Sequence, residues 1–579
     1  MFNLYKIKKI INDKKKILNL KLIFFYNFIN FILELLSILS IPIFTSLLIN
    51  QNYLIEKYNI QIPLYFSKNN LIIIISIIII FLFILKNIFY IFLIYKQSRF
   101  IREVKIEITD KVFSQYLLGS YSNHLSKNPS TLARDITYSV QSFGFYLFHL
   151  IVLFREIVSV IFIILLLFFV QPLIILGSAV FLVLIALIFQ IKFKKKLRDK
   201  ANENQELNEL FTKYIYNIFL SIKDIKILGR EFDIINKFKS KVYRYENNLF
   251  FFQILERLPK SMLEILSIFF LLVLSLLLSN ITDDQTELFI TLSFFLVAII
   301  RLLPSFTSAS ASINYLKIYE PGFLDLYNEI KKSTKLNYIY RKDFKDNFKK
   351  AKSNKKIIII NKLTFGYYKN NYFIKDLNLE FSQGEMNCIV GKTGSGKSTL
   401  FNLMLGLLKP QNGNIYFNGE NIENDIPNWH KVIGFVSQDP YLFDDSIINN
   451  ITFNILENKI DKKRLNKAIQ ISELHETINK LPEGLNTMIS AQSINLSGGE
   501  KQRIALARAL YKESNILFLD EFTNAIDDET EKRIMRNLKG LRNKTFIIIS
   551  HKKSTINQCD KIWRLEKNKI YLERKGSKI

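Results

Sequence analysis

The sequence predicts two domains of different kinds: an all-α transmembrane domain of six spans with long cytoplasmic helical extensions, followed by an α/β nucleotide-binding domain with a P-loop. Three observations predict this. The chain has 579 residues, more than one ordinary domain holds. Apolar stretches crowd residues 21–306, whereas the remainder has the mixed composition of a soluble domain. A phosphate-binding sequence begins at Gly391.

Six apolar stretches are long enough to cross a bilayer, which takes about 20 residues in a helix. The first is too long for a secretory signal peptide, so we expect a retained span. The connections alternate between basic and non-basic, and basic connections stay in the cytoplasm. This predicts cytoplasmic termini and a cytoplasmic nucleotide-binding domain. The predicted spans lie near 22–49, 71–95, 143–170, 173–191, 262–279 and 288–306.

Two long cytoplasmic connections and a linker complete the domain plan. Residues 96–135 and 192–250 carry scattered apolar positions in charged, proline-poor sequence, which predicts helices that continue out of the membrane. Residues 331–356 are rich in Lys and Arg and poor in apolar residues, as is typical of a solvated linker. We therefore place the transmembrane domain at 1–330, the charged linker at 331–356 and the nucleotide-binding domain at 357–579.

A P-loop follows an apolar strand at 386–390 and precedes a helix at 399–408, the context that this motif requires. Its glycines let consecutive backbone N–H groups wrap phosphates at a helix N-terminus. We expect Lys397 to reach the β- and γ-phosphates of ATP and Ser398 to bind Mg²⁺. The residues expected to contact ATP are Gly391, Lys392, Thr393, Gly394, Ser395, Gly396, Lys397, Ser398 and Thr399.

A second nucleotide motif ends in two acids. The apolar run Ile516–Leu519 reads as a buried strand and leads directly into Asp520 and Glu521. A strand of this kind places its terminal carboxylates beside the phosphates held by a P-loop. We expect Asp520 to hold Mg²⁺ and Glu521 to act as the general base that orients the attacking water.

A third motif is specific to one family. Leu496-Ser497-Gly498-Gly499-Glu500-Lys-Gln-Arg503 resembles the signature of ATP-binding cassette (ABC) proteins, and the flanking motifs follow the order of an ABC cassette. The resemblance implies that Tyr367 stacks on adenine, that Gln438 contacts the metal, and that His551 contacts the γ-phosphate. It also implies that Ser497, Gly498 and Gly499 of one copy face the ATP of a second copy. A homodimer with ATP and Mg²⁺ as cofactors follows.

Six spans followed by one cassette resemble a half-transporter of the ABC exporter type. Three segments are similar to bacterial flippases of lipid-linked oligosaccharides that serve protein N-glycosylation: Pro440–Ser446, Gln558–Glu566 and Arg301–Ser305. This implies an inner-membrane ATPase that flips a polyprenyl-pyrophosphate-linked oligosaccharide. The alternative is export of another amphiphile, such as a glycolipid, drug or peptide. The intact Glu521 and His551 count against a regulatory or channel-like ABC protein.

Three positions depart from the family pattern. Glu500 replaces the usual Gln of the signature, and Asn524 replaces the usual Ser before Ala525, where communication across the dimer is expected to change. Residues Ile489–Ser493 stand where exporters usually have a loop with Gly and an acid that touches the membrane domain. The last departure leaves the coupling contacts open, but not the ATP chemistry.

Charged residues within spans are functional candidates. Lys86, Lys260 and Arg301 lie about 20–27 Å from the outer membrane ends when counted at 1.5 Å per residue. Three cations at one level predict contact with the phosphate or pyrophosphate of an anionic lipid-linked substrate. Internal neutralisation is the alternative, because acids lie at similar depth: Glu34, Glu156 with Arg155 beside it, and Glu264.

Composition excludes several other classes of function. The net charge of +28 suits nucleic acid, but the basic residues follow the membrane topology and form no groove-reading motif. We therefore expect membrane lipid and a second copy as partners, and no nucleic acid. The two cysteines, Cys388 and Cys559, support neither a disulfide framework nor a cysteine zinc site.

Overall fold

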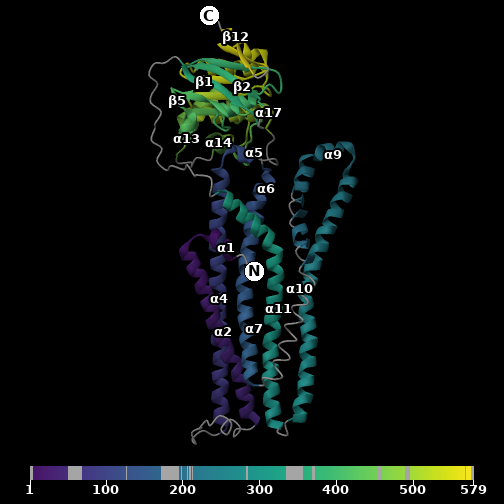
Figure 1. The fold of residues 1–579 in the computed structure, drawn as a ribbon. Coiled ribbons are helices and arrows are strands. Elements are labelled where there is room, and N and C mark those ends of the chain that lie inside the picture. Colours follow the sequence, from purple (N-terminus) through teal and green to yellow (C-terminus); the bar gives the residue numbers. More distant parts are fainter. Residues whose placement is uncertain are drawn as a thin grey trace. The chain divides into compact units, whose positions relative to one another are not determined.

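The computed structural model divides into two compact units (Figure 1), Met1–Gly119 with Asn123–Tyr338, and Ser120–Ser122 with Ile339–Ile579. Each unit is described by itself below. The structure describes residues 4–49, 68–125, 127–170, 195–196, 199–204, 206–207, 210–211, 213–281, 285–333, 356–367, 372–453, 459–489, 496–566 and 569–575.

The first unit is helical throughout its described part. The short helix α5 begins in the stretch that groups with the second unit. The elements are α1 (Leu4–Ile11), α2 (Lys14–Ile49), α4 (Lys68–Leu117), α5 (Tyr121–Leu125), α6 (Pro129–Arg134), the π-helix η1 (Asp135–Ser139), α7 (Val140–Val170), α9 (Ile222–Leu228), α10 (Glu231–Ile281) and α11 (Gln285–Ser333).

Five helices of the described part are long and apolar enough to cross a membrane, and they coincide with five predicted spans. The sixth, near 173–191, lies outside the described residues. The 51 residues of α10 extend about 76 Å at 1.5 Å each, far beyond the bilayer core of about 30 Å. Helices α4 and α10 thus confirm the predicted extension beyond the membrane. The five candidates are Lys14–Thr45, Ile72–Leu117, Pro129–Leu165, Glu231–Leu276 and Thr291–Lys332.

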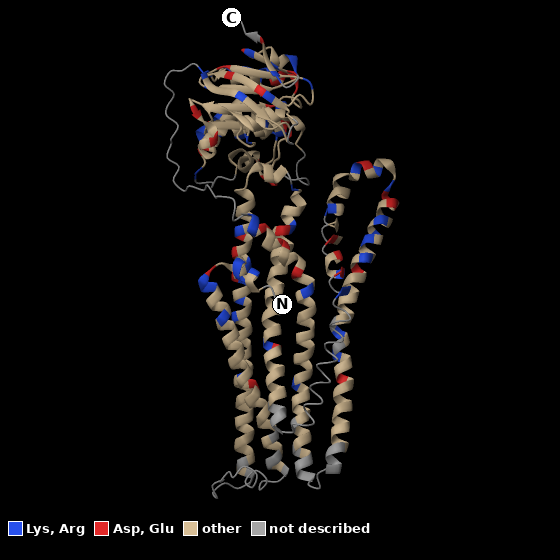
Figure 2. Cartoon of the chain, in the orientation of Figure 1, with Lys and Arg blue, Asp and Glu red and all other residues tan. Residues whose placement is uncertain are grey.

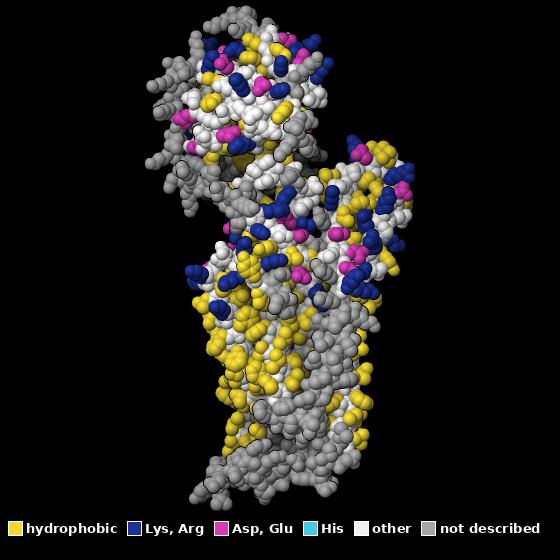
Figure 3. All heavy atoms as spheres, in the orientation of Figure 1, with side chains coloured by type: hydrophobic (Ala, Val, Ile, Leu, Met, Phe, Trp, Pro, Cys, Tyr) yellow, Lys and Arg dark blue, Asp and Glu magenta, His cyan; other side chains and the backbone are white. Residues whose placement is uncertain are grey.

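Aromatic stacking joins α7 to α11. Phe143 and Tyr146 of α7 both stack on Phe323 of α11, with ring centroids 5.8 and 4.6 Å apart, and all three are buried. Figure 2 shows few charges along the middle of the helices, and on the face in Figure 3 most of the described side chains in that zone are hydrophobic. Lipid offers no hydrogen-bond partners, so a membrane-spanning segment must satisfy its backbone polar groups within the helix. It must also present an apolar outer surface, and these helices fit both requirements.

The part of the second unit that the structure describes contains three sheets. A six-stranded sheet has the order β12-β11-β3-β10-β9-β6, a four-stranded sheet has the order β2-β1-β4-β5, and β7 pairs with β8. The strands are β1 (Lys356–Phe365), β2 (Ile374–Ser382), β3 (Met386–Val390), β4 (Asn412–Phe417), β5 (Glu420–Asn421), β6 (Ile433–Val436), β7 (Asp445–Ser446), β8 (Met488–Ile489), β9 (Ile516–Asp520), β10 (Thr545–Ile549), β11 (Lys561–Glu566) and β12 (Lys569–Lys575).

The described helices of the second unit pack with its strands in two hydrophobic cores. They are α12 (Lys397–Met404), α13 (Ile426–Val432), α14 (Ile447–Thr452), α15 (Lys462–Ile471), α16 (His475–Asn479), α17 (Gly498–Tyr511), α18 (Asp528–Lys539) and α19 (Lys553–Ile556). Short 3₁₀ turns lie at η2 (Ile422–Asn424) and η4 (Gly484–Asn486).

Strands β3, β10 and β9 are parallel and form the buried centre of the sheet. Every residue of β3 and β10 is buried, as expected of parallel strands covered on both faces. Ile549 of β10 pairs with Ile389 of β3 and with Asp520 of β9. The three strands therefore end at the same edge, and the segments that follow them lie close together.

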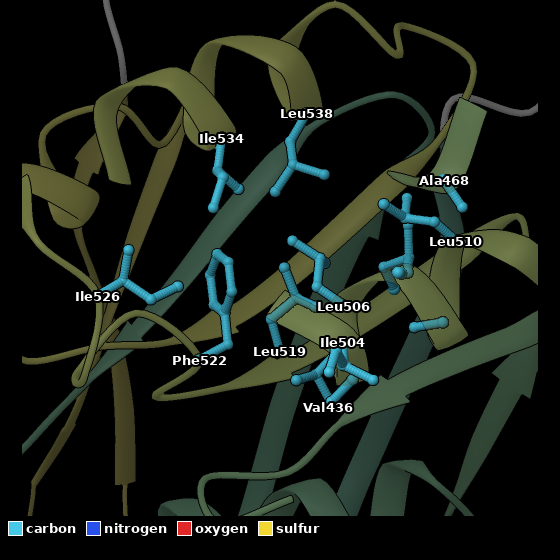
Figure 4. Packing of buried hydrophobic residues seen from close by; sticks show 14 of the residues in the cluster. Val436, Ala468, Ile504, Leu506, Leu510, Leu519, Phe522, Ile526, Ile534 and Leu538 are labelled. Atoms are coloured by element: carbon cyan, nitrogen blue, oxygen red, sulfur yellow. The ribbon is translucent and has the colours of Figure 1, made fainter. Parts of the chain in front are cut away.

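Alternate residues of β9 point into two hydrophobic cores. Leu519 packs with Leu506 of α17, Phe522 and Leu538 of α18 in the core drawn in Figure 4. Phe518 belongs to the other core, where Phe401 of α12 lies 5.5 Å away between ring centroids. Burial of both faces fixes the strand register, since successive side chains alternate. The predicted fold class, an all-helical membrane domain plus an α/β P-loop domain, is confirmed.

Candidate functional site

The P-loop connects β3 to α12 through a turn that only glycine fits. Gly394 and Gly396 have φ of 81° and 98°, which disfavour other residues. A Cβ at Gly391 would lie 2.6 Å from the carbonyl oxygen of Leu565. The Ser395 hydroxyl is buried and makes no hydrogen bond to any described residue. An orphaned donor in such a loop fits a phosphate oxygen.

Lys397 folds back onto this loop. Its Nζ donates to the carbonyl oxygens of Gly391, at 2.8 Å, and of Lys392, at 3.1 Å. Burial lowers the pKa of Lys397, and the carboxylates of Glu521 and Asp520 oppose that shift. Lys397 thus lies among the groups that the sequence assigned to the phosphates and Mg²⁺.

Asp520 and Glu521 follow β9 at the same edge. Burial raises the pKa of Asp520 to about 6, and the neighbouring Glu521 carboxylate adds to that rise, whereas Lys397 opposes it. A bound divalent cation would reverse this cost by stabilising the charged carboxylate. Asp520, Ser398 and Gln438 all offer oxygen atoms, the ligands that Mg²⁺ prefers. The residues present therefore fit the predicted Mg²⁺.

Glu521 accepts two side-chain hydrogen bonds and lies close to a histidine. Gln438 Nε2 and Asn524 Nδ2 donate to its Oε2, at 2.9 and 2.6 Å, and His551 Nε2 lies 3.4 Å from its Oε1. Its φ is 45°, a strained conformation for this residue type. The structure thus brings together Glu521, Gln438 and His551, as the sequence predicted. It adds Asn524, which the sequence singled out only as a departure from the family pattern.

Tyr367 and the signature occupy other parts of the second unit. Tyr367 is 47% exposed, and its hydroxyl lies 3.4 Å from that of Thr399; a partly exposed aromatic ring suits stacking on adenine. Ser497 caps α17, and the Ser497 N–H donates in return to Glu500 Oε2 at 2.8 Å. This capping box gives the unusual Glu500 a structural role. A Cβ at Gly499 would lie 2.6 Å from the Ala525 carbonyl oxygen, which excludes larger residues.

Two family models match the chain: "ABC transporter transmembrane region" over residues 22–303 and "ABC transporter" over 374–524. The chain is an ABC exporter half-transporter. Its fold is similar to that of a bacterial Atm1-family ABC exporter with ATP bound, with a TM-score of 0.72, 20% identity, and coverage of 96% of this chain and 95% of that chain.

Curated relatives match this half-transporter over part of its length. The Escherichia coli alpha-hemolysin translocation ATP-binding protein is 39% identical over 225 residues, 38% of this chain and 32% of that protein. The ATP-dependent lipid A-core flippase of Cupriavidus metallidurans is 38% identical over 200 residues, 34% of each chain. The half-transporter thus spans about a third of the length of these relatives.

ATP with Mg²⁺ is the cofactor of the ABC cassette, and the family match supports hydrolysis coupled to transport. When bound, Mg²⁺ would supply positive charge that stabilises the negative charge developing on the phosphate. Lys397 and the P-loop amides would hold the phosphates, and Ser398, Gln438 and Asp520 the metal. Glu521 would accept a proton from water, and His551 would add a donor beside it.

The candidate substrate residues of the half-transporter lie on three helices of the first unit. Arg301 of α11 forms an ion pair with Glu34 of α2. Lys260 Nζ lies 3.9 Å from Glu264 on its own helix, α10. Lys86 of α4 lies 4.9 Å from the Phe83 ring centroid and forms no ion pair with any described residue. The pairings of Arg301 and Lys260 have the geometry that internal neutralisation predicts. Lys86 lacks such a pairing among the described residues.

Replacing Glu521 by Gln should leave ATP binding intact and slow ATP turnover at least about 100-fold, because Gln keeps the shape but cannot accept a proton. ATP affinity and hydrolysis rate are measured on the same purified protein. Lys397→Ala provides the contrast, since loss of the ammonium should weaken ATP binding itself. Normal turnover by Glu521→Gln would contradict the assignment of the base.

Proposed function

We propose that two copies of this chain form an ATP-driven exporter that flips a polyprenyl-pyrophosphate-linked oligosaccharide across the bacterial inner membrane. The observation that carries the proposal is the environment of Glu521, a carboxylate next to Asp520 that accepts from Gln438 and faces His551. Such a site is equipped to activate water beside bound ATP. The apolar helices on the same chain would let ATP hydrolysis drive transport across a membrane.

The homodimer follows from what one chain contains. The sequence has one P-loop and one ABC signature. Gly498 and Gly499 open the 14-residue helix α17, whose N-terminus favours a negative charge. In the family resemblance, this end faces the ATP of a second cassette. Two identical chains supply one another with the second half of each site.

Lys86 and Arg301 support an anionic cargo. Both interact electrostatically with Glu34, so two cations share one acid at this place between α2, α4 and α11. A positive surplus in an apolar environment is costly and attracts an anionic group. A phosphate or pyrophosphate makes charge-assisted hydrogen bonds to such cations, while a polyprenyl chain suits the apolar helix surfaces.

Export of another amphiphile is the second candidate. Arg155 lies 2.6 Å from Glu156, Lys260 pairs with Glu264, and Arg301 with Glu34. An interior neutralised in this way does not require an anionic cargo. The named relatives leave both candidates open, because one is a toxin translocation protein and the other a lipid A-core flippase, and both match only about a third of this chain.

ATP hydrolysis in proteoliposomes distinguishes the two candidates. Polyprenyl-pyrophosphate oligosaccharide should stimulate hydrolysis more than polyprenyl phosphate without sugar, phospholipid or peptide does. Stimulation by peptide or phospholipid alone would support the second candidate. Wild-type protein that hydrolyses no ATP in any of these membranes would overturn the ATPase proposal.

The dimer can be tested by mixing chains. Ser497→Arg places a bulky cation at the end of α17 that is proposed to face the partner's ATP. Adding chains with this change to wild-type chains before reconstitution should lower ATP hydrolysis in proportion to the heterodimers formed. Tagged copies are used to count the heterodimers. Full activity in a preparation shown to be monomeric would refute the shared site.

Lys86→Gln should impair flipping more than basal ATP hydrolysis, because the cassette chemistry needs no residue of α4. Loss of one charge-assisted contact, about 1.5–3 kcal/mol, corresponds to a loss of head-group affinity of about 10- to 100-fold. Lys86→Arg keeps the charge and should retain flipping. Transport, ATP hydrolysis and thermal stability are measured on each variant.

Arg301→Gln and Lys260→Gln complete this comparison. If Arg301 only neutralises Glu34, its loss leaves a buried acid without its cation and lowers thermal stability before it affects transport. Lys260 and Glu264 have side chains 62% and 50% exposed, so their separation should cost little stability. Unimpaired flipping by all three folded variants would rule out the anion site.

A further inference from the structure

An ion pair between Lys552, the residue after His551, and the fully buried Glu531 lies in the second unit. Lys552 donates from Nζ to the main-chain carbonyl oxygens of Thr523, at 2.8 Å, and Ile526, at 2.9 Å. Its third hydrogen bond goes to Oε2 of Glu531, at 3.1 Å. An ammonium group has three N–H donors, so the contacts of Lys552 use all of them.

Glu531 on α18 has no exposed surface, and its side chain is satisfied at both oxygens. Oε2 accepts from Lys552, while Oε1 accepts from the hydroxyls of Ser554, at 2.8 Å, and Thr555. A buried carboxylate is tolerated only with such partners. The pair therefore ties together three segments: the 523–526 loop after β9, helix α18, and the 551–555 segment after β10.

Two of the groups around Glu521 belong to these tied segments. His551 immediately precedes Lys552 and lies 3.4 Å from Glu521 Oε1. Asn524 lies between the two residues whose carbonyls bind Lys552, and it donates to Glu521 Oε2 at 2.6 Å. Lys552 thus binds the loop that carries Asn524 and follows His551 directly in the chain. Both Asn524 and His551 contact Glu521, the carboxylate that is proposed to activate water.

We propose that Lys552 and Glu531 form a positioning pair that holds Asn524 and His551 in place around Glu521 during ATP hydrolysis. The inference rests on the proposed ATPase function and adds two residues outside the predicted ATP and Mg²⁺ contacts. Hydrolysis depends on groups kept within about 0.5 Å of their productive positions, so a loosened 523–526 loop slows the reaction. ATP binding depends on the P-loop and Tyr367, which lie on other segments.

Glu531→Gln removes the charge that holds Lys552 while keeping the acceptor for Ser554 and Thr555. The kcat for ATP should fall about 10- to 100-fold, the effect of one charge-assisted hydrogen bond, while the KM for ATP stays unchanged. Lys552→Met should act in the same way. Because both changes break the same pair, the two together should be little worse than either alone.

Two further variants separate positioning from folding. Glu529→Gln is the matched control, since this carboxylate on the same helix is 85% exposed and should leave kcat unchanged. Replacement of both partners, Glu531→Met with Lys552→Met, removes the buried charges together and should preserve the fold. This double variant should unfold cooperatively near the wild-type temperature and still hydrolyse ATP slowly.

Wild-type kcat in folded Glu531→Gln or in the Met double variant would overturn the inference. Equal losses of kcat and of ATP affinity would also overturn it, because they indicate a general role in folding. Failure of the wild-type protein to hydrolyse ATP would instead overturn the proposed function. A selective loss of kcat in folded variants, with a normal Glu529→Gln control, is the result that supports the positioning pair.

Discussion

The parallel pairing of β3, β10 and β9 is the constraint on which the rest of the second unit depends. Their residues are buried on both faces, so a shift by one residue would exchange the side chains that pack in the two cores and disturb the packing of both. With the register fixed, the segments after Val390, Asp520 and Ile549 begin at one edge. The P-loop, the acidic pair and His551 meet there although they are far apart in sequence.

Sequence predicted this edge because each motif follows an apolar strand, and parallel strands end together. The same reasoning could not predict Lys552 or Glu531, since neither has a motif and their roles depend on which loops the fold brings together. Asn524 was recognised as a departure, but its contact with Glu521 depends on the 523–526 loop geometry. Residues whose function comes through main-chain carbonyls leave little trace in sequence.

The first unit was predictable for a different reason. In lipid, backbone polar groups must hydrogen-bond within the segment, so long apolar stretches are expected to be helices. Five described helices overlap the predicted spans. Hydropathy gives depth but not rotation about the helix axis. The depth of Arg301 and Glu34 was therefore evident in the sequence, whereas their ion pair between α11 and α2 depends on how the helices are rotated. Which charged side chains neutralise one another within the membrane could therefore be determined only from the packed structure.

The contacts of Glu521 distinguish its two oxygens. Oε2 accepts from two amides, Gln438 at 2.9 Å and Asn524 at 2.6 Å, while Oε1 faces His551 at 3.4 Å. A carboxylate that accepts a proton needs a lone pair directed at water, and two short hydrogen bonds occupy Oε2. This assigns Oε1 as the oxygen for water and the amides as the groups that orient it. Asn524 is one of those amides, and its loop is bound by Lys552, so the proposed positioning pair would help to keep Oε2 occupied and Oε1 free for water.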